Sequence, residues 1–520
     1  MMNFKNITIF LTTLISASAY SITLKDERLY YRCYGHFTKM RPSADDSRLK
    51  KIKAKQMSYI DACMEVYDMA KLNQNGSLVE KNNISISVLE TFNMLHMSWF
   101  QDINVYNVST GGVNMDYFLH DGAESALHFT RTLFYPDAKF KDSITSDTTY
   151  LAERSKGFNT GAYFPVTNNS PVYGSSKNTT FIGINNLPDY ETNNALTVGK
   201  LLDPENKKNG LHLQVGKLIG ITPMEHVYAN DSYHCFYNTN TKVISCPQEW
   251  PRYTVDRPAN LTQSFGSGLI GTQPYIKINR NRNFQTDDGG IMAGRVWSKR
   301  LYQDLMCRDL PVVQQQDAVS SVDKDGNNYL PFRNTSKCMQ CHVSIDTMAY
   351  SIRGLKLNKL GHNPIEQATV FYFLEQYEQN YLAEEAGPVL GLGAGKAADS
   401  AFYKRPPRGA LYFRSHDGKL IHERIQGLKG QTSLGEAIAK TDDFYLCASK
   451  RYFEFLTGHK INIQDITDPS SIKYNAKEEK IYKYLLSLTT KLKSNQNVRE
   501  IIKEIISSDV YKEADFDIKY

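Results

Sequence analysis

Residues 335–349 read TSKCMQCHVSIDTMA, and the stretch is built around Cys338-Met339-Gln340-Cys341-His342, a C-x-x-C-H string. Two thiols at this spacing lie on one turn of a helix, and His342 follows directly. Because the chain has only 8 Cys and 12 His in 520 residues, chance is a weak explanation for the string. The spacing therefore predicts that two thiols and one imidazole act together.

The chemistry of a covalently bound haem fits this spacing. Cys338 and Cys341 can add to the two vinyl groups of one haem, and His342 can offer Nε2 to the iron. A thioredoxin-like pair expects a strand-to-helix setting and does not need the His. A zinc site needs a second Cys/His pair, which the sequence lacks. We therefore predict one covalent haem c.

The second axial ligand is open. All 14 Met lie at or before residue 348, and Met339 and Met348 lie on or beside the predicted haem helix. A ligand farther along the chain must then be His, and we favour His362 or His422. The other candidates are His416 and His459 downstream, Met292, Met306 or a His upstream, and an open sixth position.

The first residues predict export. Lys5 precedes the short apolar run Ile7–Ile15, and Ala17-Ser18-Ala19 supplies the small residues of a cleavage site. We interpret residues 1–19 as a signal peptide. The apolar run is far shorter than a membrane-spanning helix requires, and no later segment is long and apolar enough. We expect a periplasmic or cell-surface protein without a transmembrane segment in the mature chain.

Export gives meaning to the remaining cysteines, because disulfides persist outside the cytoplasm. Six cysteines remain after haem attachment, and they allow 15 pairings. Proximity favours Cys235–Cys246, and Cys33–Cys63 would tie the mature N-terminus to the first helix. Cys307 and Cys447 are then left to bridge the two flanks of the haem segment. The alternative is that some of the six are buried free thiols.

Length and composition place the chain among large globular proteins. It has 520 residues, 41% hydrophobic and 22% charged, and a net charge of +6. No basic stripe is present, which argues against a nucleic-acid partner. We predict a mainly α fold with a helical N-terminal domain (20–156), a loop- and strand-rich region (157–285) and a helical cytochrome c-like haem region with a small hairpin (286–520).

Hydrophobic periodicity predicts the individual elements. Within the middle region, Val172–Ile182 and Val243–Cys246 are predicted to form strands between long loops. Leu411–Ile425 is predicted to form a hairpin around Asp417-Gly418, and Ser433 with Glu436 is predicted to open a helix. The other predicted helices are Ile60–Leu72, Val88–Phe100, Ala123–Phe134, Met292–Met306, Pro364–Leu382, 442–457 and 476–508.

The haem segment also resembles a family. Cys338–Ala349 is similar to the C-x-x-C-H-x-x-I-D-P-x-G segment of the planctomycete-type multi-domain cytochrome c proteins, which are built from adjoining domains of unknown function. The resemblance covers roughly residues 285 to 520, and 85 to 155 faintly. Its other matching segments are Gly289-Gly290-Ile291, Leu305-Met306-Cys307-Arg308, Phe444–Gly458 and Ile502–Tyr511, with Ile144–Arg154 a weaker match.

The resemblance implies an exported haem protein with Cys338, Cys341 and His342 as its haem residues. It also makes Cys307 and Cys447 family-like positions, which favours their pairing. Two departures affect the turn after the haem helix: Thr347 stands where Pro is usual, and Met348 lies near the expected Gly.

Three functions fit these features. One haem, a small net charge and no second cofactor motif favour an electron-transfer protein with an unspecified redox partner. A chain this long also fits a haem enzyme of the peroxidase or oxidase kind, although a di-haem peroxidase would need a second C-x-x-C-H. Tyr-rich loops in 157–285 would suit a surface-binding protein with a structural haem. The sequence does not decide whether the chain is an enzyme.

Overall fold

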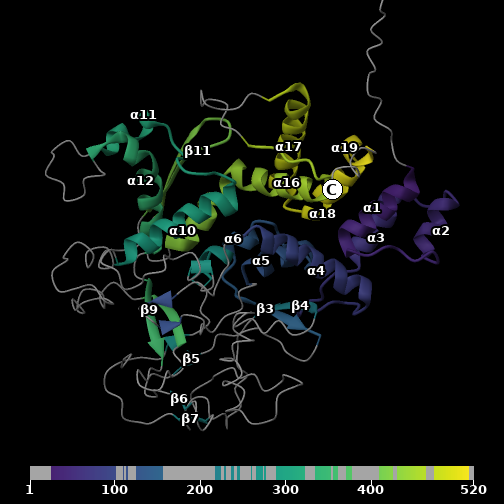
Figure 1. Cartoon of the computed structure of the whole chain (residues 1–520), viewed down its shortest axis with the longest axis horizontal. Helices are drawn as coiled ribbons and strands as arrows, with labels where there is room; N and C mark the ends of the chain where they lie inside the picture. Colours follow the sequence, from purple (N-terminus) through teal and green to yellow (C-terminus); the bar gives the residue numbers. More distant parts are fainter. Residues whose placement is uncertain are drawn as a thin grey trace, which may run out of the picture.

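The computed structural model shows a mainly helical chain (Figure 1). It describes residues 25–100, 109–110, 113–114, 124–155, 217–223, 228–229, 236–238, 243–245, 259–260, 265–272, 275–276, 289–322, 334–352, 355–360, 371–376, 409–425, 430–463 and 474–513. The predicted signal peptide and the predicted domain boundaries at 156–157 and 285–286 lie outside these residues. No described helix combines the length and apolar character needed to span a bilayer.

The N-terminal region is helical, as the sequence predicts. Three of its helices begin after polar residues whose side chains accept hydrogen bonds from first-turn N–H groups: Asp46 before α2, Ser58 before α3 and Asn82 before α4. The helices are α1 (Asp26–Thr38), α2 (Ser47–Lys53), α3 (Tyr59–Asp68), α4 (Asn83–Ser98), α5 (Glu124–Phe134) and α6 (Asp142–Thr145).

The C-terminal region forms a second set of helices around α10 and α16. Helix α10 packs against α12 and α16, and α16 packs against α17. Gly458 ends α16 in the left-handed conformation, with φ 67°. The helices are α10 (Gly289–Met306), α11 (Gln315–Ala318), α12 (Ser336–Ala349), α15 (Gly430–Lys440), α16 (Asp442–Thr457), α17 (Ala476–Asn495), α18 (Val498–Ser507) and α19 (Asp509–Lys512).

The described strands form antiparallel pairs. The predicted hairpin is confirmed as β11 (Gly409–Arg414) with β12 (Leu420–Ile425), and its turn contains Gly418 at φ 81°. The predicted strand at Val243 is confirmed as β7 (Val243–Ser245), which pairs with β6 (Phe236–Asn238), whereas Val172–Ile182 lies outside the described residues. The other pairs are β1 (Ser109–Thr110) with β2 (Val113–Asn114), β3 (Tyr150–Arg154) with β4 (Leu218–Pro223), β5 (Tyr228–Ala229) with β8 (Ala259–Asn260), and β9 (Leu355–Leu360) with β10 (Phe371–Gln376).

The predicted helix Pro364–Leu382 is wrong where the structure describes it, because Phe371–Gln376 is strand β10. The run Phe371-Tyr372-Phe373 has high strand propensity. Its partner β9 alternates Leu355 and Leu357 with Lys356 and Asn358, which is the period of a strand. Pairing between distant segments therefore outweighs the local helical period.

Two helix boundaries also differ from the prediction. The segment 476–508 is two helices, because Gln496 takes a left-handed φ of 59° and Asn497 caps α18 by accepting from Arg499 N–H. Helix α15 begins at Gly430, ahead of the predicted cap Ser433. Polar Asn and Gln residues at 495–497 are the sequence signal for the break.

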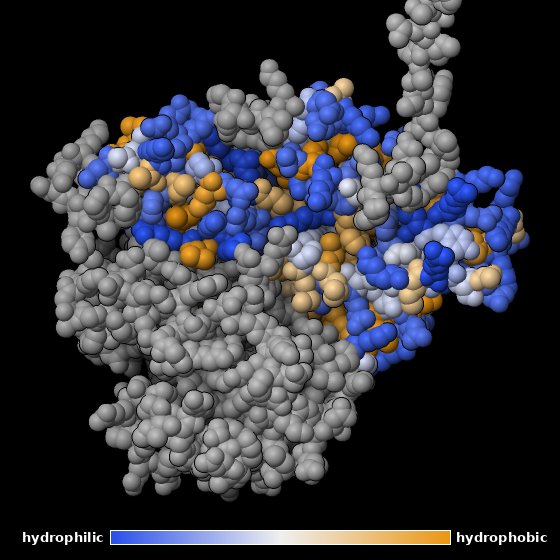
Figure 2. All heavy atoms as spheres, in the orientation of Figure 1, coloured by the Kyte–Doolittle hydropathy of each residue, from blue (hydrophilic) through white to orange (hydrophobic). Residues whose placement is uncertain are grey.

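Aromatic side chains join the N-terminal helices to the C-terminal ones. Phe92 of α4 lies between Phe134 of α5 and Phe455 of α16, with ring centroids 5.6 and 5.9 Å away. Tyr59 of α3 donates its hydroxyl to Ile506 O at 2.8 Å. The buried residues of both regions form one hydrophobic cluster, while Figure 2 shows a largely hydrophilic coloured surface with apolar patches between. The two ends of the chain thus share one core.

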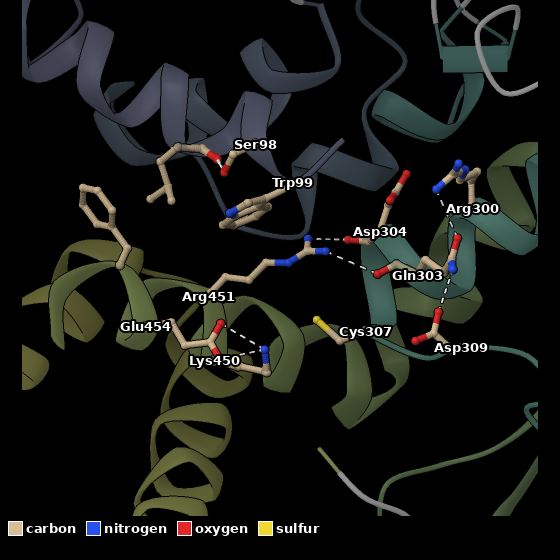
Figure 3. Close-up of a pocket in the computed structure, with 12 residues that line it drawn as sticks. Ser98, Trp99, Arg300, Gln303, Asp304, Cys307, Asp309, Lys450, Arg451 and Glu454 are labelled. Atoms are coloured by element: carbon tan, nitrogen blue, oxygen red, sulfur yellow. Dashed lines mark hydrogen bonds and ion pairs between the residues drawn. The ribbon is translucent and has the colours of Figure 1, made fainter. Parts of the chain in front are cut away.

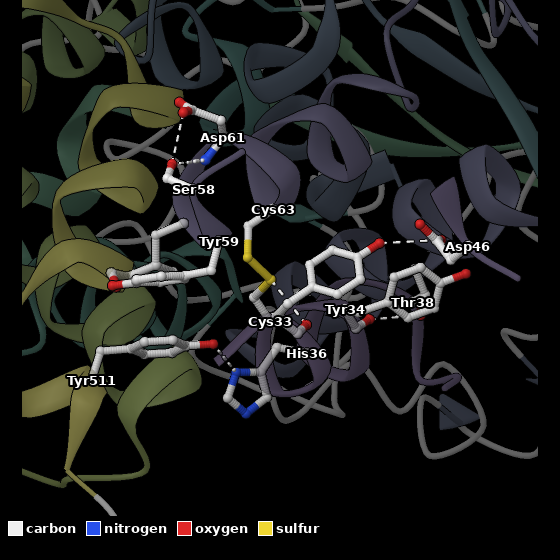
Figure 4. Close-up of a disulfide and its surroundings, with 12 residues drawn as sticks. Cys33, Tyr34, His36, Thr38, Asp46, Ser58, Tyr59, Asp61, Cys63 and Tyr511 are labelled. Carbon is white, nitrogen blue, oxygen red and sulfur yellow. Dashed lines mark hydrogen bonds between the residues drawn. A yellow bond between two sulfur atoms is a disulfide. The ribbon is translucent and has the colours of Figure 1, made fainter. Parts of the chain in front are cut away.

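Two disulfides connect neighbouring helices. Cys33 of α1 bonds to Cys63 of α3, with Cα atoms 6.0 Å apart (Figure 4). Cys307, at the end of α10, bonds to Cys447 of α16, with Cα atoms 5.3 Å apart. The second is the bridge that the family resemblance favours. Cys235 and Cys246 lie outside the described residues.

The two bridges differ in the length of chain that they close. The Cys307–Cys447 bridge closes a loop of 140 residues, which corresponds to about 5 kcal/mol of lost unfolded-state entropy. The Cys33–Cys63 bridge closes a loop of 30 residues, which corresponds to about 4 kcal/mol. We expect the pair Cys307→Ala/Cys447→Ala to lower the free energy of unfolding more than Cys33→Ala/Cys63→Ala. Urea unfolding followed by tryptophan fluorescence measures both. An equal or larger loss for the Cys33/Cys63 pair would contradict the expectation.

Candidate functional site

Helix α12 carries the C-x-x-C-H residues on one face. Thr335 caps the helix by accepting from Cys338 N–H. Positions 338, 341 and 342 have i, i+3, i+4 spacing, so their side chains project from the same side. Cys338 is exposed, and Cys341 and His342 are partly exposed, whereas Val343 and Ile345 are buried. The structure therefore brings the three predicted haem residues together at an accessible surface.

The two thiols of this face differ from the other described cysteines. Cys338 and Cys341 are free, while Cys33, Cys63, Cys307 and Cys447 are all in disulfides. Burial, with the nearby Cys338, raises the pKa of Cys341 above its usual value. The Cys341 thiol is therefore not activated as a thiolate, the form that a dithiol redox enzyme uses. Two free thiols remain available for covalent attachment.

The imidazole of His342 is oriented by a carboxylate. Its Nδ1 lies 3.3 Å from Asp346 Oδ1, one helical turn along α12. Arg295 of α10 donates to the same carboxylate from Nε at 2.5 Å and from Nη2 at 3.0 Å. Burial opposes ionisation of Asp346, but the hydrogen bonds from His342 and Arg295 outweigh it and hold the pKa of Asp346 below its usual value. An ionised Asp346 favours the tautomer with its proton on Nδ1.

Close packing fixes the other end of α12. Gly409 of β11 approaches the carbonyl of Thr347 so closely that a Cβ there would overlap it. Thr347 Oγ1 donates to Val343 O at 2.6 Å and lies 3.4 Å from Ala410 O. The residue found where the resemblance expects Pro thus satisfies a helix carbonyl and contacts the hairpin. Helix α12 thus packs against both strand β11 and helix α10.

The remaining candidates are placed as follows. His422 lies exposed on β12, with its ring edge-on to Tyr412 at 5.1 Å. His416 is buried, and both its N–H and its Nδ1 lie within hydrogen-bond distance of Asp443. Met306 is fully buried in the core. His362 lies outside the described residues, so the second axial ligand stays a prediction.

Sequence reasoning missed Asp346 and Arg295 as parts of the site. The signal for Asp346 was present, because an acid four residues after His342 lies on the same helix face. Arg295 carried no such signal, because its partnership depends on how α10 crosses α12.

A hollow of about 520 Å³ lies near the other end of α10, between α4, α10 and α16 (Figure 3). Its cations already have partners: Arg451 donates to Asp304 O and Gln303 O and lies over the Trp99 ring, and Lys450 pairs with Glu454 at 2.8 Å. Burial raises the pKa of Asp304 to about 6, and Tyr275 donates to its carboxylate. Because the charged groups that line it already contact one another, we interpret this hollow as the place where the three helices meet and not as a ligand site.

Within the described residues, no three His, Cys, Asp or Glu side chains gather as a direct metal site. A haem needs less of the chain, because the porphyrin supplies four nitrogen ligands and His342 would supply one. Comparisons with protein-family models, with curated proteins and with solved structures find no match for this chain. The functional interpretation therefore depends on the geometry of α12.

Proposed function

We propose that the chain is an exported c-type cytochrome that carries one haem and serves electron transfer. Cys338 and Cys341 hold the haem through thioether bonds, and His342 ligates its iron. One observation carries the proposal: two free thiols and an imidazole project from one accessible face of α12, while the other described cysteines are in disulfides.

The residues around His342 fit this role. Asp346 accepts from Nδ1, which leaves Nε2 as the nitrogen that faces a metal. Arg295 keeps Asp346 ionised, and the hydrogen bond to an anionic acceptor raises the basicity of the imidazole. The bound haem would supply a one-electron redox couple. The chain's contribution is to fix the orientation and donor strength of His342.

The proposed location follows from two features. The N-terminal residues Lys5 to Ala19 have the pattern of a secretory signal. Two disulfides bridge the described helices, and such bonds persist in oxidising compartments. We infer a periplasmic or cell-surface protein. The resemblance of residues 285 to 520 to the planctomycete-type multi-domain cytochrome c proteins supports the same assignment.

A second role, haem-based catalysis, is favoured by the same Asp346. A carboxylate bonded to the proximal imidazole increases its donor strength and stabilises oxidised iron. Catalysis would also need an open sixth position. The two roles therefore differ in coordination, which can be measured.

Haem attachment is the first prediction of the proposed function. Protein produced with cytochrome c maturation machinery should keep haem through denaturing electrophoresis, and Cys338→Ala/Cys341→Ala should lose it because no thioether can form. The control Lys337→Ala changes an exposed neighbour on the same turn and should leave attachment unchanged. Wild-type protein without covalent haem would refute the proposal.

Coordination is the second prediction. If the chain carries electrons, the reduced protein should be low-spin and its absorption spectrum should not change with carbon monoxide, because both axial positions are filled. Protein that binds carbon monoxide supports the catalytic role instead. His422→Ala should open the sixth position only if His422 is the second ligand. An unchanged spectrum in that variant would remove His422 from the candidates.

The third prediction separates an effect on the haem reduction potential from an effect on folding stability. Asp346, which is buried, and Asp317, which is half-buried, each form a two-bond pair with an Arg, Asp317 with Arg414 at 2.6 and 2.7 Å. Asp346→Asn should destabilise the fold by about 3 kcal/mol, and Asp317→Asn by less, because solvent screens the half-buried Asp317 pair. Only Asp346→Asn should raise the haem reduction potential, because only Asp346 contacts His342. Potentiometric titration of both variants measures this, and equal potentials would contradict it.

A further inference from the structure

A second hollow, of about 510 Å³, lies beside α5 and is independent of the α12 site. We call it the α5 pocket; it is bounded by α5, the turn after it, α6 and the start of β3. His128, Arg131, Tyr135 and Tyr150 line it. Its volume falls within the range of small-molecule sites in proteins.

Arg131 is a buried cation that has no anionic partner among the described residues. The residue is 8% exposed, and its guanidinium carbon lies 3.3 Å from the ring centroid of Tyr135 and 4.8 Å from that of Tyr150. Among the described residues its side chain has no ion pair, and its buried Nε has no hydrogen-bond partner. By contrast, Arg295, Arg414 and Arg499 each bind a carboxylate. Two aromatic rings therefore contact the guanidinium of Arg131, and no anion among the described residues does.

His128 is the second unsatisfied group in the α5 pocket. It is 1% exposed, and neither ring nitrogen has a hydrogen-bond partner among the described residues. Its Nε2 lies 3.9 Å from Glu124 Oε1, beyond hydrogen-bond distance. Burial, with the nearby Arg131, lowers the pKa of His128 to about 3, so the ring is neutral at pH 7 and can donate one hydrogen bond.

His96 shows what such a residue looks like when its role is structural. It is as deeply buried as His128, and burial likewise lowers its pKa to about 3. Both of its nitrogens, however, lie 2.8 Å from hydroxyl groups, those of Thr130 and Tyr452. A buried polar atom without a partner costs about 1–3 kcal/mol. The lack of partners at His128 and Arg131 together therefore points to a ligand.

No carboxylate among the described residues forms an ion pair with Arg131, and the buried Glu124 lies beside His128 instead. Asp142 accepts from Lys139 N–H at 2.8 Å, and Asp137 is exposed. Neither forms a described ion pair with Arg131. We propose that the α5 pocket binds a small oxyanion, a carboxylate or a phosphate, through the guanidinium fork of Arg131 with a hydrogen bond from His128. A planar fork is well matched to the paired oxygens of both groups.

Isothermal titration of the full chain tests the proposal, with inorganic phosphate and lactate as separate probes at constant ionic strength. We expect saturable one-site binding of at least one probe. Binding of phosphate alone assigns a phosphoryl ligand, binding of lactate alone assigns an organic acid, and binding of both assigns oxyanions in general. If neither probe binds, the proposal is overturned.

Variants locate the binding. Arg131→Gln should weaken binding by about tenfold or more, because the charge and the fork are lost. The control Arg499→Gln removes an arginine that pairs with Asp68 elsewhere on the surface and should bind like the wild type. Thermal unfolding checks that each variant is folded. If Arg131→Gln does not fold, Arg131→Lys decides, since it keeps the charge without the fork. Wild-type affinity in Arg131→Lys, or in folded Arg131→Gln, would overturn the proposal.

Discussion

Asp346 lies inside the protein as an anion, and this is possible only because its two partners come from fixed positions. A buried carboxylate must be paired and hydrogen-bonded to stay ionised. Arg295 supplies two bonds from α10, and His342 supplies a third from the previous turn of α12. The crossing of α10 and α12 therefore also sets the orientation of His342. Packing of Gly409 against Thr347 holds the far end of the same helix.

The N-terminal helices depend on the C-terminal ones for part of their core. Phe92 contacts Phe455, and Tyr59 donates to Ile506 O. Asp68 of α3 binds Arg499 of α18. Figure 1 shows α1 and α3 beside α18 and α19, although these helices stand at opposite ends of the sequence. The region that contains α12 and the N-terminal helices are thus stabilised together, and the Cys307–Cys447 bridge lies within their common core.

Sequence predicts the strongly periodic and capped elements well. The mainly α class, the hairpin around Gly418 and the end of α16 at Gly458 all follow from local signals. Local signals give the wrong prediction where pairing with another segment determines the structure. Phe371–Gln376 is such a case, because it forms a strand by pairing with β9. At the site, the motif names Cys338, Cys341 and His342, and helical spacing could have added Asp346. Arg295 could not be predicted, because only the crossing of two helices brings it to Asp346.

The α5 pocket could not be predicted from the sequence. His96 and His128 are both buried histidines on helices, and nothing in their local sequence separates a ring with hydrogen-bond partners from one without. The difference lies in the hydroxyls of Thr130 and Tyr452, which reach His96 and do not reach His128. The same holds for the arginines: Arg451 meets two backbone carbonyls, whereas Arg131 meets two aromatic faces. The hydrogen-bond partners of buried side chains in the folded protein therefore identify a candidate site that no motif indicates. This site lies on helices separate from α12.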